Sequence, residues 1–140
     1  MSKYQWGTLS RARLSTCHPL LQVLANRLIA RADLPCDLTI VCGHRDRQAQ
    51  NDAFRNGFSK SRWPTSKHNS MPSHAFDFAP LTEGKIDWAD DAAWQKTGPL
   101  FEEEWACMQV EGLVPAGVTL SWGGRWTSFR DLPHVELRGI

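Results

Sequence analysis

The chain has 140 residues, enough for one domain that buries its own hydrophobic core. Hydrophobic residues make up 41% and charged residues 22%, and this ordinary globular composition excludes a disordered or fibrous protein. The net charge of +1 gives no bulk electrostatic reason to expect binding to nucleic acid or to an anionic membrane. We therefore expect a single domain over residues 1–140. The unusual count is seven tryptophans against one tyrosine.

The first predicted element is a helix over residues 19–31. Its apolar residues recur at helical spacing, and Ser15 or Thr16 precedes it as a cap. The run 38–42, Leu-Thr-Ile-Val-Cys, is rich in β-branched residues and predicts a buried strand. A second helix is predicted to begin after Asp46, whose carboxylate can cap it.

That second helix should end near Gly57, since glycine favours helix ends. Residues 58–72 are rich in Ser, Lys, Pro and Asn and predict a long loop, which in a compact domain is usually functional or disordered. Residues 75–79 alternate as a strand does, with two phenylalanines on one face and Asp77 on the other.

The second half of the chain predicts one long helical region followed by strands. The helix covers residues 87–111 and should break or restart at 98–99, Gly-Pro, because proline is tolerated only in a first turn. Residues 118–122 and 133–138 predict two further strands. Helices first and strands later favour an α+β fold, with a small, mainly antiparallel sheet and helices packed on it.

Two histidines and one aspartate are candidate metal ligands. His68 lies in the predicted loop, while Asp77 and His134 lie on predicted strands, each on the face opposite the apolar side chains. Two imidazoles and a carboxylate suit zinc, and three protein ligands leave a fourth position for water. The alternatives are a capped loop at His68 and a surface ion pair at Asp77.

Four motifs in order carry a family resemblance. They are S-x-H at 66–68, A-x-D-F-A-P at 75–80, W-G-G-x-W at 122–126 and D-x-P-H-x-E-L at 131–137. This set resembles the M15 zinc peptidases and, more narrowly, the phage endolysins that act as L-alanyl-D-glutamate peptidases. The segment 84–88, Gly-Lys-Ile-Asp-Trp, is also similar to that group. The resemblance implies a compact zinc-peptidase domain of the Hedgehog/DD-peptidase-like type.

The resemblance also implies roles for single residues. His68, Asp77 and His134 match the ligands of one zinc ion per chain, and Asp131 matches the catalytic acidic residue. Arg45 matches an arginine that binds or polarises the substrate, and its guanidinium can bind carboxylates in bidentate fashion. The loop between His68 and Asp77 is longer than in the familiar form of the motif.

Further residues are candidate substrate contacts. They are Gln50, Ser66, Trp122 and Trp126. Ser66 either hydrogen-bonds near the metal or only shapes the loop, and the tryptophans either line a groove or belong to the core. Glu136 shares the predicted strand face of His134, where it either orients that ligand or forms a salt bridge.

These residues lead to one expected function and two alternatives. We expect a zinc-dependent endolysin that cuts the peptidoglycan stem, with L-Ala–D-Glu as the expected bond, for host cell lysis. The alternatives are a D-Ala–D-Ala carboxypeptidase or dipeptidase of the same family, and a non-catalytic wall-binding relic.

The expected partners and location follow from the same resemblance. The expected partner is bacterial peptidoglycan, with neither nucleic acid nor membrane insertion, and we expect a monomer. No signal peptide and no separate wall-binding domain are predicted, so synthesis in the host cytoplasm would precede release to the wall through a holin-like protein.

Overall fold

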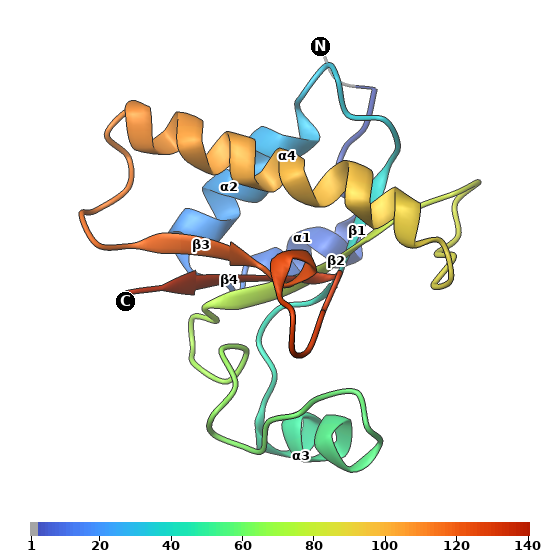
Figure 1. The fold of residues 1–140 in the computed structure, drawn as a ribbon, viewed down its shortest axis with the longest axis vertical. Coiled ribbons are helices and arrows are strands. Elements are labelled where there is room, and N and C mark those ends of the chain that lie inside the picture. Colours follow the sequence, from blue (N-terminus) through green and yellow to red (C-terminus); the bar gives the residue numbers. More distant parts are fainter. Residues whose placement is uncertain (1–2) are drawn as a thin grey trace.

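The computed structural model describes residues 3–140, which form a four-stranded sheet and four α-helices (Figure 1). The elements are α1 (Thr8–Leu14), α2 (Pro19–Ile29), β1 (Leu38–Cys42), α3 (Arg47–Arg55), β2 (Ala75–Pro80), α4 (Asp91–Val110), β3 (Thr119–Trp122), the short 3-10 helix η1 (Gly123–Arg125) and β4 (His134–Arg138). The strand order is β1-β2-β4-β3, and every neighbouring pair is antiparallel. The predicted α+β class with a small antiparallel sheet is confirmed.

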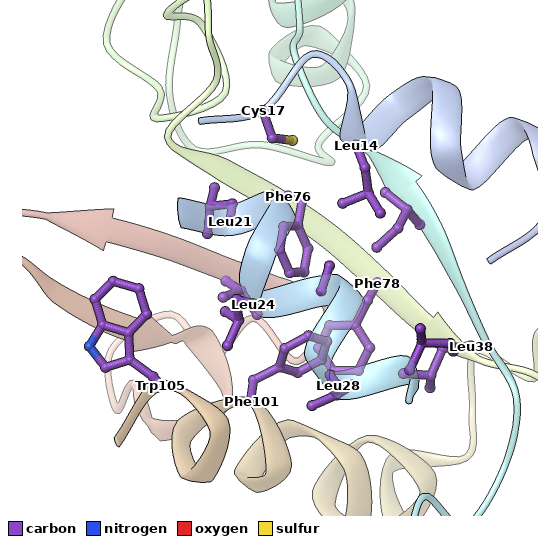
Figure 2. Packing of buried hydrophobic residues seen from close by; sticks show 14 of the residues in the cluster. Leu14, Cys17, Leu21, Leu24, Leu28, Leu38, Phe76, Phe78, Phe101 and Trp105 are labelled. Carbon is purple, nitrogen blue, oxygen red and sulfur yellow. The ribbon is translucent and has the colours of Figure 1, made fainter. Parts of the chain in front are cut away.

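The hydrophobic core lies between the sheet and the two longest helices. In Figure 1, α2 and α4 lie on one side of the sheet, while α3 and its flanking loops lie on the other. The rings of Phe76 and Phe78 lie 5.5 and 4.8 Å from that of Phe101, which comes from α4. Figure 2 shows these rings packed with leucines of α2. One face of β2 therefore packs in the core, and the alternate residues of this strand point to the side of α3.

The start of α2 differs from the sequence prediction. Its cap is His18, whose Nδ1 accepts a hydrogen bond from the backbone N–H of Leu20 at 3.1 Å. Ser15 and Thr16 are not its caps, because their hydroxyls donate back to carbonyls in the last turn of α1. Helix α1 was not predicted from the sequence, and these hydroxyls were therefore expected at the start of the wrong helix.

The predicted break in the long helix is wrong, because α4 runs through Pro99 without interruption. The hydroxyl of Thr97 donates to the carbonyl of Ala93 at 2.9 Å inside this turn. A Cβ on Gly98 would lie 2.2 Å from the ring of Trp122, so the glycine permits close packing of α4 against β3. Packing along a long amphipathic helix outweighs the cost of one internal proline, which is about 3 kcal/mol.

The other predicted elements agree with the structure to within a few residues. The strand over 38–42 is confirmed without change, and Asp46 caps α3 by accepting a hydrogen bond from the N–H of Ala49 at 2.8 Å. Within residues 3–140, no helix has both the length and the apolar character needed to cross a membrane.

Candidate metal centre and active-site cleft

Strand pairing brings Asp77 and His134 together. In the antiparallel ladder of β2 and β4, Asp77 lies directly opposite His134, and Phe76 lies opposite Val135. Because side chains alternate along a strand, the two phenylalanines and Val135 enter the core while Asp77 and His134 share the opposite face. The pattern that builds the core thus also places two candidate ligands side by side.

His68 reaches the same point from the loop between α3 and β2. Its Nδ1 lies 2.7 Å from the carbonyl oxygen of Gly43, to which it donates. Its own carbonyl accepts a hydrogen bond from the N–H of Arg45 at 2.8 Å, so the loop is tied to the chain that follows β1. The imidazole is buried, and these bonds fix which nitrogen faces the other two side chains.

The three side chains form a nearly equilateral triangle of ligand atoms. His68 Nε2 lies 3.3 Å from His134 Nδ1 and 3.3 Å from Asp77 Oδ1, and the remaining side is 3.2 Å. A tetrahedral zinc ion with bonds of about 2.0–2.1 Å needs ligand atoms about 3.3–3.4 Å apart. These donors therefore fit zinc in both type and spacing, and all three residues also line an open cleft.

A second layer of groups fixes His134. Its Nε2 donates to Oε1 of Glu136 at 2.8 Å, and Oε2 of Glu136 accepts a hydrogen bond from Nε of Arg138 at 2.9 Å. Glu136 is itself buried. The two alternatives considered for Glu136 are therefore both present, since one oxygen faces the histidine and the other forms the salt bridge.

The triad carries strongly shifted pKa values in the metal-free protein. Burial lowers the pKa of His68, but attraction to Asp77 and hydrogen bonds to Asp77 and Cys42 outweigh it and raise the pKa to about 10. Burial raises the pKa of Asp77, but attraction to His68 and hydrogen bonds from both histidines bring it well below its usual range. Burial lowers the pKa of His134, whereas hydrogen bonds to Asp77 and Glu136 raise it overall.

Asp131 lies beside the triad. Its Oδ2 is 4.0 Å from His134 Nδ1, and its backbone N–H donates to the carbonyl of Gly123 at 2.9 Å. A Cβ on Gly123 would lie 2.2 Å from the carbonyl oxygen of Asp131, so this glycine allows the two segments to approach. Burial and the nearby charge of Asp77 raise the pKa of Asp131. A carboxyl group of raised pKa next to candidate ligands suits proton transfer.

Arg45 lines the cleft, but Gln50 does not reach it. One guanidinium nitrogen of Arg45, Nη2, lies 3.6 Å from Oδ2 of Asp77, and Nη1 donates to Oε1 of Gln50 at 2.9 Å. Gln50 is 0% exposed, and its amide nitrogen donates to the hydroxyl of Ser59 and the carbonyl of Ser61. Gln50, which was expected to contact substrate, is instead buried and accepts a hydrogen bond from the guanidinium group of Arg45.

The two tryptophans of the W-G-G-x-W motif have different positions. Trp122 is 3% exposed and lines neither hollow near the site. Its indole packs against α4, and Nε1 donates to the carbonyl of Leu132 at 2.7 Å. The ring of Trp122, expected from the sequence to contact substrate, therefore packs in the core and not in the cleft. Trp126 does line the cleft, with its ring 5.2 Å from that of His134, and Ser66 lines it as well.

The cleft has a volume of about 960 Å³. The substrate contacts predicted from the sequence leave out several residues of its lining, namely Cys42, Phe58, Lys60, Lys67, Trp88 and Phe129. Lys60 lies over the ring of Phe129, with Nζ 5.3 Å from the centroid, and so connects the 58–72 loop to the segment before Asp131. The exposure of Phe58, Trp88 and Phe129, large apolar side chains around one opening, is a signal that appears only in the folded chain.

This α+β domain, with a triangle of two buried histidines and the partly buried Asp77 open to a cleft, has the site of a metal-dependent hydrolase. The family model described as phage L-alanyl-D-glutamate peptidase matches residues 1–138. The chain therefore belongs to the phage L-alanyl-D-glutamate peptidase family.

Individual relatives agree with this assignment. The L-alanyl-D-glutamate peptidase of Escherichia phage T5 is 34% identical over 137 residues, which cover 96% of this chain and 90% of the relative. The peptidoglycan L-alanyl-D-glutamate endopeptidase CwlK of Bacillus subtilis (strain 168) is 28% identical over 132 residues, covering 88% of this chain and 74% of the relative. The fold matches the crystal structure of the Serratia marcescens L-Ala D-Glu endopeptidase ChiX with a TM-score of 0.73 and 21% identity, covering 96% and 91% of the two chains.

Proposed function

We propose that this chain hydrolyses the bond between L-Ala and D-Glu in the peptide stem of bacterial peptidoglycan. One zinc ion per chain would be held by His68, Asp77 and His134. The observation that carries the proposal is the triangle of ligand atoms, with sides of 3.2–3.3 Å, in the wall of an open cleft. The family and the named activities of the relatives support the choice of bond.

A zinc ion held by His68, Asp77 and His134 would lower the pKa of a bound water to about 7 and act as a Lewis acid toward a substrate carbonyl. Asp131 accepts the proton of the attacking water and delivers it to the leaving amine of D-Glu, as its burial and raised pKa suit it to do. Both proton transfers use the same carboxyl group, so the enzyme returns to its starting state after each cycle.

Arg45 binds or polarises the substrate. The stem carries free carboxylates on D-Glu and on any diaminopimelate that follows, and a guanidinium group binds a carboxylate with two parallel hydrogen bonds. Gln50 holds one edge of Arg45, which leaves the other edge toward Asp77 and the cleft. Ser66 and Trp126 line the same cleft and provide further contacts to the stem.

Action on the wall also implies a route to it. We infer that the protein is made in the cytoplasm of a bacterial host, works as a monomer, and reaches the peptidoglycan when a holin-like protein opens the inner membrane. The phage relative supports this setting.

Product analysis tests the proposal. The zinc-loaded protein is incubated with purified peptidoglycan, and the products are identified by mass spectrometry. We expect L-Ala retained on the lactyl group with a new free carboxylate, and a released peptide that begins with D-Glu. Loss of only the terminal D-Ala would instead identify a carboxypeptidase. Intact stems despite bound zinc would identify a non-catalytic wall-binding protein.

A further inference from the structure

Trp88 is a large aromatic side chain held at the surface. It is 59% exposed and belongs to the segment between β2 and α4. Its ring stacks on that of Trp94, with centroids 5.6 Å apart and an interplanar angle of 26°. Trp94 is 2% exposed, and its Nε1 donates to the carbonyl of Phe78 at 3.1 Å. One face of the Trp88 ring thus packs on Trp94, which is hydrogen-bonded to the sheet. The other face of the Trp88 ring is exposed to solvent.

Exposing so much aromatic surface gives up the hydrophobic free energy that burial would provide. The support from Trp94 makes the exposed ring rigid, so binding a ligand on it costs little conformational entropy. A rigid, exposed ring is a common property of surfaces that bind flat apolar faces.

Trp88 lies between the active-site cleft and a second, smaller hollow. It lines the active-site cleft and also a second hollow of about 360 Å³, and Asp131 and Pro133 line both as well. The volume of the second hollow lies within the range of about 300–1,000 Å³ that is usual for small-molecule sites. The second hollow therefore adjoins the active site on the side of the candidate acid/base residue.

The second hollow carries polar groups in addition to the indole. Asp91 and Arg130 line it and form an ion pair, with Arg130 Nη2 3.2 Å from Asp91 Oδ2. Both side chains remain about half exposed. A carboxylate and a guanidinium group supply the acceptors and donors that a hydroxylated ligand needs.

We propose that Trp88 is the stacking platform of a sugar subsite, which takes the N-acetylated amino sugar that carries the peptide stem. This inference rests on the proposed cleavage between L-Ala and D-Glu. In peptidoglycan, L-Ala is the first residue of the stem and is joined through its amino group to the lactyl group of that sugar. One residue spans about 3.3–3.6 Å, so a sugar must lie close to any enzyme group that acts on this bond.

The chemistry of the sugar matches the subsite. A pyranose ring has a face of C–H groups, and these pack on the electron-rich face of an indole. Its hydroxyl and acetamido groups point outward from the ring edge, where the carboxylate of Asp91 and the guanidinium group of Arg130 can bind them. The indole thus contributes affinity, and the ion pair contributes orientation.

Kinetics with two matched substrates test the subsite. One is a muropeptide that carries its disaccharide, and the other is the same peptide with an N-acetylated L-Ala and no sugar. The measured quantity is the ratio of the two kcat/KM values, in which any general loss of folded enzyme cancels. We expect Trp88→Leu to lower the preference for the muropeptide about tenfold, mainly through KM.

Two further variants separate stacking from other effects. Trp88→Phe keeps a flat ring and should retain most of the preference. Trp63→Leu makes the matched change at a tryptophan that lines neither hollow, and it should leave the ratio at the wild-type value. A wild-type ratio in Trp88→Leu, or an equal loss in Trp88→Phe and Trp88→Leu, would overturn the proposal.

A binding measurement without hydrolysis keeps this inference separate from the proposed function. The peptide-free disaccharide is titrated into the protein, and the indole N–H signals are followed by NMR. The Trp88 signal is assigned by its loss in Trp88→Leu. We expect this signal to shift in a saturable manner at millimolar disaccharide. Its failure to move would refute the sugar subsite even if the stem is cleaved, whereas uncleaved stems would refute only the proposed activity.

Discussion

Glu136 Oε1 lies 2.8 Å from His134 Nε2, and this contact turns the other ring nitrogen of His134 toward Asp77 and His68. The two residues are two positions apart on β4, so the alternation of the strand places them on the same face. Arg138, two positions further along, binds the second oxygen of Glu136. One strand thus provides a candidate ligand, the group that orients it and the charge that holds this group.

We expect Glu136→Ala to weaken zinc binding about 10–100-fold, the usual effect of removing a group that orients a metal-bound histidine. Glu136→Gln keeps an acceptor for the His134 N–H and should lose less. Competition with a chromophoric chelator measures both affinities. Glu102→Gln is the matched control, because Glu102 forms a surface ion pair with Arg125 away from the triad. Wild-type zinc affinity in Glu136→Ala would contradict an orienting role.

The shifted pKa values of the triad predict how pH affects the metal-free protein. The pKa of His68 is raised from about 6.5 in an unfolded chain to about 10, so its contribution to stability is complete below pH 6.5 and is lost as pH rises toward 10. The lowered pKa of Asp77 contributes stability above about pH 4, which is lost as pH falls further. Thermal unfolding of the metal-free protein should therefore show the highest midpoint between about pH 4 and 6.5.

Zinc should reverse the alkaline part of this dependence. A metal ligand must be unprotonated, so zinc bound at this site would displace the proton that His68 otherwise holds at neutral pH. Calorimetric titration in buffers of different ionisation enthalpy should show release of about one proton or more per zinc at pH 7. The gain in melting temperature on adding zinc should grow from pH 6 to pH 8. A gain that shrinks over that interval would argue against binding at these histidines.

Asp131 should be required for turnover but not for binding the metal. Its carboxylate lies outside the triangle of ligand atoms, 4.0 Å from His134 Nδ1. We expect Asp131→Asn to lower kcat by about 10²–10⁴-fold, the usual contribution of a general acid or base, with the zinc content unchanged. Hydrolysis of purified peptidoglycan and metal analysis of the same sample give the two values. Undiminished hydrolysis by this variant would remove Asp131 from the mechanism.

The strand residues of the site follow from local sequence, whereas its other parts depend on long-range contacts. The alternation around Asp77 and His134 has period two, so a single strand pattern predicts which side chains leave the core. Their direct pairing across β2 and β4 and the approach of the loop that carries His68 depend on tertiary structure. The family motifs indicate the candidate ligands without this long-range information. They do not distinguish Trp122, a core residue, from Trp126, a cleft residue.

The position of Gln50 also could not be predicted from local sequence. From the sequence it is a polar residue near the site, and contact with substrate is a reasonable expectation. In the fold, α3 directs it inward, where its Oε1 accepts hydrogen bonds from Arg45 and Asn69. Nothing local to residues 46–57 indicates this direction, because the partners of Gln50 lie in the preceding turn and in the following loop.

This placement yields a prediction for stability and substrate binding together. Gln50→Ala removes a fully buried side chain. Arg45, Asn69 and the 59–61 segment then lose their hydrogen bonds to it. We expect the free energy of unfolding to fall by about 2–4 kcal/mol, from the cavity and the unpaired polar groups. Because Arg45 loses the group that fixes one edge of its guanidinium, KM for the peptide stem should rise. Chemical denaturation and steady-state kinetics measure the two effects.

The neighbouring Gln48 provides the control for this experiment. It lies on the exposed side of the same helix, so Gln48→Ala should change the free energy of unfolding by no more than about 0.5 kcal/mol and leave KM unaltered. If Gln50→Ala destabilised the fold but left KM at the wild-type value, Arg45 would not depend on Gln50 for its position. If the two alanine variants were equally stable, the buried hydrogen-bond network around Gln50 would contribute nothing measurable to folding.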